Sequence, residues 1–212
     1  MKQIDEIYDS KNPCWDTFLE LKPYFNMSNE DLIHKDIVQV LSNYVLGKSP
    51  SLIEDIRRDF VAPRWSCAVP SPNIIEEILP FSPLIEVGAG NGYWANLINQ
   101  AGGEISAFDL GIDYQAKYFD VRNSKDADYS LFQNHTLLLI WPSDGRDWAY
   151  ELLKNNEWNR LIYIGEGRGG RMASSRFFDI LDEEYVLEKR ISMPTYPGWS
   201  DSFHVYCRKV NL

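Results

Sequence analysis

Three glycines stand at alternate positions directly after a short apolar run in the 212-residue chain. They are Gly88, Gly90 and Gly92, and the run before them, Leu84–Val87, has the length of a buried strand. The amphipathic segment Tyr93–Gln100 follows and predicts a helix. Glycine lets a ligand approach the backbone closely, and the start of a helix offers unpaired N–H groups. This order predicts a nucleotide-type binding site, with a plain structural turn as the alternative.

Two acidic residues flank this loop in the sequence. Glu86 stands two residues before the first glycine, and Asp109 ends the next apolar run, Ile105–Asp109. A carboxylate at the end of that strand can accept both hydrogen bonds of a ribose diol. NAD sites use such an acid too, so only the glycine spacing can distinguish a dinucleotide site from another nucleotide-type site. The dinucleotide pattern needs a small residue at the third position, where this chain has Tyr93.

The order of strand, G-x-G-x-G loop, helix, strand and terminal acid resembles that of class I (Rossmann-like) S-adenosylmethionine (SAM) dependent methyltransferases. The resemblance covers about residues 65–212. It implies that SAM is the cofactor. The cofactor-binding residues that it implies are Glu86, Gly88, Gly90, Gly92 and Asp109. The family's adenine contact follows the third strand, and Asp126 is the candidate for it, with a solvated loop acid as the competing interpretation.

The exit of the predicted strand Thr136–Trp141 faces the methyl donor, because ligands bind outside the carboxyl ends of parallel strands. Amino-group methyltransferases of the family carry Asp/Asn-Pro-Pro-aromatic there. This chain matches only at Pro142, between Trp141 and Ser143, which disfavours amino methylation of nucleic acids. The face of Trp141 suits stacking on a flat or cationic substrate. Closure of the sheet edge is the alternative role for this residue.

The exit of the predicted strand Leu161–Ile164 carries Glu166 in a glycine-rich loop. A carboxylate there suits binding of an amine or acceptance of a proton, with Asp144 as the other acceptor and an incidental surface charge as the competing interpretation. The candidate catalytic residues are therefore Trp141, Pro142 and Glu166. No set of His, Cys, Asp and Glu residues has metal-ligand spacing, so we predict no metal site.

Short apolar runs alternate with helical segments from residue 84 onward, which predicts crossover units and a mostly parallel sheet. Further strands are predicted at Tyr118–Val121, Tyr185–Ile191 and Ser202–Arg208, and the last two are joined without a helix, hence antiparallel. We expect an α/β fold with a doubly wound, mostly parallel seven-stranded sheet and an antiparallel last strand. Residues 1–62 are predicted as an N-terminal helical cap, and 63–212 as the Rossmann-like SAM-binding domain.

The amino-acid composition disfavours several classes of binding partner and of structural site. Asp and Glu number 31 against 21 Lys and Arg, a net charge of −10, which disfavours nucleic acid and anionic membranes. Three widely spaced cysteines speak against a disulfide framework and a cysteine-based zinc site. No apolar run approaches ~18 residues, and the N-terminus lacks an apolar leader segment. We therefore expect a soluble, cytoplasmic protein without a membrane span.

The sequence as a whole predicts a SAM-dependent methyltransferase. A small molecule or a protein is favoured over nucleic acid as the acceptor, and the sequence leaves the target atom and the oligomeric state open. Two alternatives stay open as well. A non-catalytic SAM-binding or interaction protein is suggested by the altered fourth-strand motif and the helical N-terminus. An NAD-dependent oxidoreductase is opposed by Tyr93.

Overall fold

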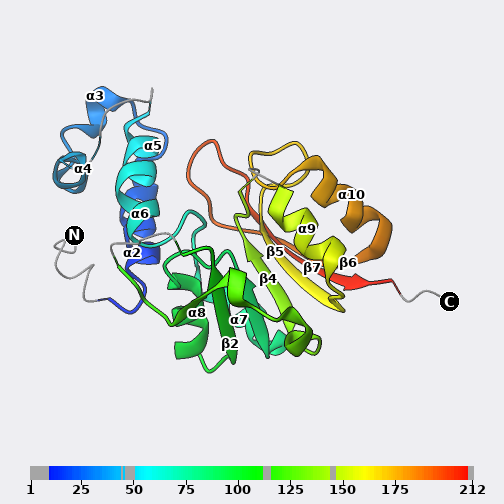
Figure 1. The fold of residues 1–212 in the computed structure, drawn as a ribbon. Coiled ribbons are helices and arrows are strands. Elements are labelled where there is room, and N and C mark those ends of the chain that lie inside the picture. Colours follow the sequence, from blue (N-terminus) through cyan, green and yellow to red (C-terminus); the bar gives the residue numbers. More distant parts are fainter. Residues whose placement is uncertain (1–9, 44, 46–50, 112–115, 144–146, 210–212) are drawn as a thin grey trace. The chain divides into compact units, whose positions relative to one another are not determined.

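The computed structural model describes residues 10–43, 45, 51–111, 116–143 and 147–209. The chain forms two compact units, and many of their helices and strands are labelled in Figure 1. One unit comprises Met1–Ser71 and Pro194–Trp199, and the other comprises Pro72–Met193 and Ser200–Leu212. The boundary predicted after residue 62 lies within the first of these units.

The first unit is built from short helices. They are α2 (Pro13–Leu21), η1 (Lys22–Tyr24), α3 (Asn29–Leu32), α4 (Asp36–Ser42), α5 (Leu52–Ile56), a π-helical turn η2 (Arg57–Val61) and α6 (Ala62–Arg64). Side-chain caps fix three of the starts, and at α5 the cap is Ser51, which accepts a hydrogen bond from the Glu54 N–H. Asn12 accepts a hydrogen bond from the Trp15 N–H, and Ser28 accepts one from the Asp31 N–H.

Aromatic side chains hold this helical unit together. Phe18 lies edge-on to Tyr196 with a centroid separation of 5.3 Å. The Trp199 ring lies beneath the Arg57 guanidinium at 4.3 Å, and its indole N–H donates to Glu54 at 3.0 Å. These contacts make the loop Pro194–Trp199, which lies between two strands in the sequence, part of the helical unit.

The second unit contains a seven-stranded sheet. Its strands are β1 (Leu84–Val87), β2 (Ile105–Asp109), β3 (Val121–Asn123), β4 (Thr136–Ile140), β5 (Arg160–Gly165), β6 (Tyr185–Ser192) and β7 (Ser202–Arg208). Their spatial order is β3-β2-β1-β4-β5-β7-β6. Strands β1 to β5 pair in parallel, and β7 runs antiparallel to both β5 and β6. The predicted fold class is therefore confirmed.

Helices accompany the sheet in this unit. They are α7 (Pro72–Ile78), η3 (Leu79–Phe81), α8 (Tyr93–Gln100), η4 (Ser124–Asp126), η5 (Tyr129–Phe132), α9 (Trp148–Asn155) and α10 (Ser175–Glu184). Ile85 and Val87 of β1 share a buried cluster with apolar residues of α9 and α10, which lie next to each other in Figure 1. Successive strand residues point to opposite faces, so Glu86 points away from that cluster. None of the described helices combines the length and hydropathy that crossing a membrane would require.

One predicted strand is displaced in the structure. The sequence predicts Tyr118–Val121, whereas β3 pairs with β2 only from Val121 onward. The backbone N–H of Tyr118 donates instead to the carbonyl oxygen of Asn91 at 2.9 Å. The Tyr118 ring also packs edge-on against Tyr93 at 5.0 Å. The prediction of this strand was wrong because the apolar residues before Val121 pack against the glycine loop.

Candidate functional site

The glycine loop is fixed by the strand next to it. The N–H groups of Gly88 and Ala89 both donate to the carbonyl oxygen of Phe108, at 2.8 and 3.0 Å. Gly88, Gly90 and Gly92 all have positive φ, at 79°, 58° and 78°. A Cβ added at Gly92 would lie 2.8 Å from carbon atoms of Phe119 and Val121. This loop therefore depends on glycine both for its backbone conformation and for its packing.

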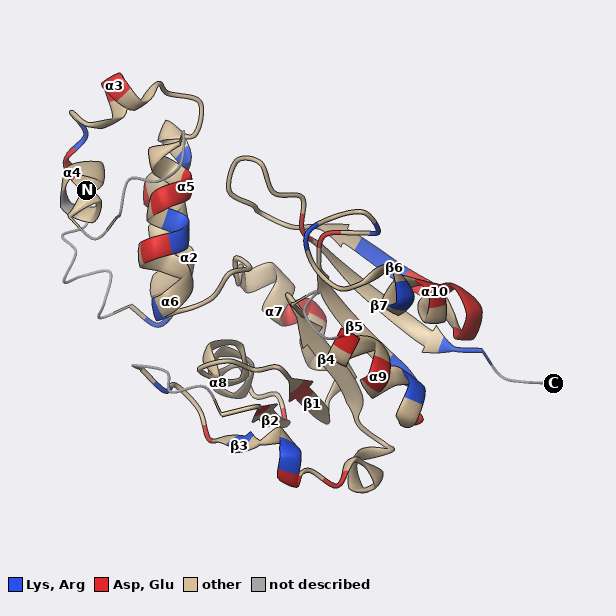
Figure 2. Ribbon diagram, turned by 45° about the horizontal axis from the view of Figure 1, so that its top comes forward, with Lys and Arg blue, Asp and Glu red and all other residues tan. Residues whose placement is uncertain are grey.

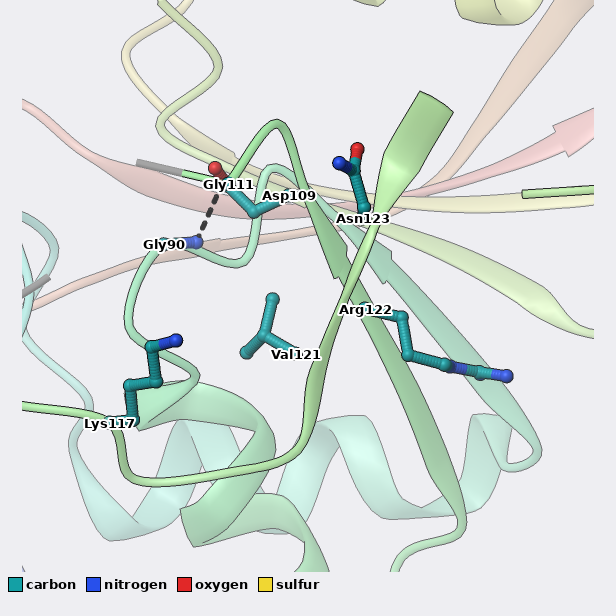
Figure 3. A pocket seen from close by; sticks show the side chains of 7 residues that line it. All are labelled: Gly90, Asp109, Gly111, Lys117, Val121, Arg122 and Asn123. Carbon is teal, nitrogen blue, oxygen red and sulfur yellow. Dashed lines mark hydrogen bonds between the residues drawn. The ribbon is translucent and has the colours of Figure 1, made fainter. Parts of the chain in front are cut away.

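Asp109 meets the glycine loop at the end of β2. Its Oδ2 accepts a hydrogen bond from the Gly90 N–H at 2.9 Å, drawn as the dashed line in Figure 3. The two residues share a pocket, and its lining consists of Gly90, Asp109, Gly111, Lys117, Val121, Arg122 and Asn123. A carboxylate has about four lone-pair sites, so Asp109 can hold Gly90 and accept further hydrogen bonds from a ligand.

Asn123, which the sequence analysis missed, lines this pocket from the end of β3. Its Oδ1 accepts a hydrogen bond from the Lys125 N–H at 3.0 Å and so caps η4. Asp126, the predicted adenine contact, is exposed within η4 and does not line the pocket. The signal that could have found Asn123 is its place at the carboxyl end of a parallel strand, where ligands bind.

Glu86 lies beneath the loop, outside the pocket lining. Its side chain is only 2% exposed, and its Oε2 has no hydrogen-bond partner among the described residues. Burial, and then the negative charge of Asp109, raise the pKa of Glu86 to about 8, although a hydrogen bond from the Ala95 backbone opposes the rise. The carboxyl group is therefore mostly protonated at neutral pH.

The exit of β4 has an unusual backbone. Trp141 has a φ of 49°, in the left-handed region, and its N–H donates to the carbonyl oxygen of Ile164 at 2.8 Å. Pro142 is buried, and its carbonyl oxygen accepts a hydrogen bond from the Ala173 N–H at 2.8 Å. Asp144 lies outside the described residues. Left-handed backbone is costly for a bulky residue and clusters at functional sites.

Trp148, at the start of α9, also reaches the glycine loop. A Cβ added at Gly88 would lie 2.8 Å from Cη2 of its indole ring. The indole N–H donates to the Ser143 hydroxyl at 3.2 Å. Trp148 was not predicted from the sequence, because its position depends on the strand order that places β4 next to β1.

Glu166 is buried at the end of β5, where it stabilises its own loop. Its Oε2 accepts a hydrogen bond from the Arg171 N–H at 2.8 Å, and its Oε1 accepts one from the Ser200 hydroxyl at 3.3 Å. The Tyr163 hydroxyl donates to the Glu166 carbonyl oxygen at 2.6 Å. Both carboxylate oxygens of this candidate catalytic residue are therefore engaged by the protein itself. Among the described residues, no group of three or more His, Cys, Asp or Glu is arranged to hold a metal ion.

Several solved methyltransferase structures are similar to this chain at low identity. Magnesium protoporphyrin IX methyltransferase from Synechocystis PCC 6803 is 12% identical, with 92% of this chain and 98% of that chain covered and a TM-score of 0.47. A TehB-like SAM-dependent methyltransferase from Corynebacterium glutamicum is 20% identical, with 65% and 86% covered and a TM-score of 0.43. The Pyrococcus abyssi tRNA (uracil-54, C5)-methyltransferase is 11% identical, with 63% and 37% covered and a TM-score of 0.42.

No model of a known protein family matches the chain, and no curated protein matches it. What the site can bind follows from its own residues.

Proposed function

We propose that this chain is a SAM-dependent methyltransferase that binds SAM in the pocket at the carboxyl ends of β1, β2 and β3. The observation that carries the proposal is the contact between Asp109 and the glycine loop. Through the 2.9 Å hydrogen bond to Gly90, a carboxylate and a backbone without side chains meet in one pocket. A carboxylate that can accept from a diol, beside a loop open to close approach, suits a nucleoside.

Different residues of the site would contact different parts of the ligand. Asp109 would accept the ribose hydroxyls, and Gly90 would let the ligand lie close to the backbone. Asn123 would face the base from β3. Bound SAM supplies a methyl group activated by a positively charged sulfonium. The task of this chain is then to align an acceptor with that methyl group, and alignment alone can supply most of the acceleration.

The acceptor side is built around the exit of β4. Trp141 keeps a left-handed backbone there, which is a feature of functional sites, and Pro142 anchors the turn through Ala173. We propose a small molecule or a protein side chain as the acceptor, since the net charge of −10 opposes nucleic acid. Glu166 would act as a base only if its loop released the carboxylate.

A SAM-binding protein without transferase activity is the second candidate. The engagement of both Glu166 oxygens within the loop favours it. A dinucleotide site is less well supported, because Tyr93 is buried against Tyr118 at the position where dinucleotide loops need a small residue.

Calorimetric titration with SAM, S-adenosylhomocysteine and NADH in parallel tests the proposal. We expect micromolar binding of the first two and none of NADH. Binding of NADH, or of no ligand, would overturn the assignment. Incubation with methyl-labelled SAM and fractionated cell extract then separates the enzyme from the non-catalytic binder. Label in a small-molecule or protein fraction supports the enzyme, and its absence supports the binder.

A further inference from the structure

Trp148 places an aromatic ring on the first glycine of the loop. The nearest indole atoms to a Cβ added at Gly88 are Cη2 at 2.8 Å and Cζ2 at 3.1 Å, so the six-membered ring lies against the Gly88 backbone. The indole N–H donates to the Ser143 hydroxyl at 3.2 Å, which fixes the orientation of the ring. The side chain is only partly buried, at the margin of the core that α9 and α10 form with the sheet.

The backbone around Trp148 is held in a costly conformation. Trp141 and Asp147 have φ values of 49° and 51°, although neither is glycine. The Asp147 carboxylate pairs with Arg176 at 2.8 Å directly before Trp148. Left-handed backbone outside glycine is sterically unfavourable and persists where the surrounding structure enforces it. The start of α9 is therefore fixed in place by specific contacts.

The strand order tells which part of a ligand Trp148 would meet. The pocket lining comes from β3, β2 and β1, in the order Asn123, Asp109 and Gly90. A nucleoside whose ribose lies at Asp109 and whose base lies toward β3 directs its 5′ substituent toward β1 and β4. Gly88 directly follows β1, and Trp148 begins α9, the helix that comes after β4 in the chain. The ring of Trp148 does not line the pocket itself, but through Gly88 it lies on the side of the loop toward which the 5′ substituent would point.

We propose that Trp148 is a specificity-determining residue whose indole face contacts the sulfonium of SAM and favours this cation over neutral S-adenosylhomocysteine. This inference rests on the proposed function. An aromatic face carries negative charge density and attracts a cation, more strongly where water is excluded. The two ligands differ at the sulfur, which is charged only in the methyl donor. Trp148 would thereby also favour release of the product.

Calorimetric titration of wild type, Trp148→Phe and Trp148→Leu with both ligands tests this inference. We expect Trp148→Leu to weaken SAM binding about five- to thirtyfold, as loss of a cation–π contact would. S-adenosylhomocysteine binding should change by less than about threefold, since a neutral sulfur loses only packing. Trp148→Phe keeps a smaller aromatic face, so its affinity for SAM should lie between those of wild type and Trp148→Leu.

Tyr150→Leu is the matched control, because it removes an aromatic ring from the same helix. Tyr150 stacks with Arg176 at 4.0 Å and packs against the same buried cluster. The ratio of the two affinities should stay at its wild-type value in this variant. Thermal melting verifies that each variant is folded, and Trp148→Phe carries the test if Trp148→Leu does not fold.

The outcomes separate the inference from the proposed function. An equal loss of affinity for both ligands would show that Trp148 only packs against the ligand, and would overturn the inference. Tighter binding of SAM by Trp148→Leu would mean that the ring occupies ligand space, and would overturn it too. If wild type binds neither ligand, the proposed function itself fails.

Discussion

At the scale of single residues, Asp109 is the side chain on which ligand binding should depend most. We expect Asp109→Asn to lower the affinity for SAM about ten- to hundredfold, because hydrogen bonds to a charged group are worth roughly 1.5–3 kcal/mol. The fold should survive, since the amide oxygen of Asn can still accept from the Gly90 N–H. Calorimetric titration gives the affinity, and the melting temperature reports the fold.

Asp128→Asn is the control for that variant. Asp128 accepts a hydrogen bond from the Ser130 N–H at 3.1 Å, much as Asp109 accepts one from Gly90. It is exposed and lies outside the pocket lining. Its replacement should therefore alter SAM affinity by less than about twofold. Equal losses in the two variants would show that total charge, and not the position of Asp109, controls binding.

Glu86 links folding stability to pH. Burial and the charge of Asp109 raise its pKa from 4.5 to about 8. Between these values the folded chain keeps a proton that the unfolded chain has released. The free energy of unfolding therefore falls as pH rises through this window. Below the window Glu86 is protonated in both states, so it adds no pH dependence to stability.

Glu86→Gln removes this titration while keeping a neutral side chain of the same shape. We expect the stability of the variant relative to wild type to increase by roughly 2–4 kcal/mol between pH 5 and pH 8. Chemical denaturation at several pH values measures this difference. Parallel pH profiles for the two proteins would contradict a raised pKa at Glu86.

At the scale of elements, Gly92 joins the glycine loop to α8 and to the segment before β3. Gly92→Ala places a Cβ 2.8 Å from carbon atoms of Phe119 and Val121, on a backbone with φ 78°. We expect it to lower the free energy of unfolding by about 2–4 kcal/mol and to weaken SAM binding. Gly102→Ala isolates the backbone cost, because Gly102 has φ 93° and open space around it. Equal losses of stability in the two variants would rule out the packing clash.

Most strands of the sheet could be predicted from local sequence. Buried parallel strands are apolar on both faces, so β1, β4 and β5 stand out as apolar runs. Strand β3, which ends at Asn123, could not be located in the same way. Its apolar residues are divided between the ladder to β2 and the contact of Tyr118 with the glycine loop. That division depends on tertiary contacts with Asn91.

The candidate site was predictable where it is continuous in sequence. The glycine loop and Asp109 lie on consecutive elements, so their spacing already indicates the pocket. Trp148 depends on the adjacency of β4 and β1. The engagement of Glu166 depends on Ser200, far along the chain. Such contacts follow from strand order and loop packing, which local patterns do not contain.

At the scale of the whole molecule, several arginines of the sheet-containing unit are paired with carboxylates. Arg168 contacts Asp179 and Asp182, each at 2.7 Å, and Arg208 contacts Glu184 at 2.9 Å. Helices α9 and α10 both carry acidic and basic residues, as Figure 2 shows. Local pairing reduces the positive potential that these arginines would present to a phosphate backbone.

We therefore expect no retention of bulk tRNA in an electrophoretic mobility assay at about 150 mM salt and roughly 10 μM protein. Non-specific binding of nucleic acid requires cations that displace counterions from phosphates, and this chain has a net charge of −10. A free small molecule or a protein acceptor carries no comparable density of phosphates. Retention that weakens steeply as salt rises would reveal a basic face and move nucleic acid to the head of the candidate acceptors. Absence of retention, together with SAM binding, would direct the search for the acceptor to small molecules and proteins.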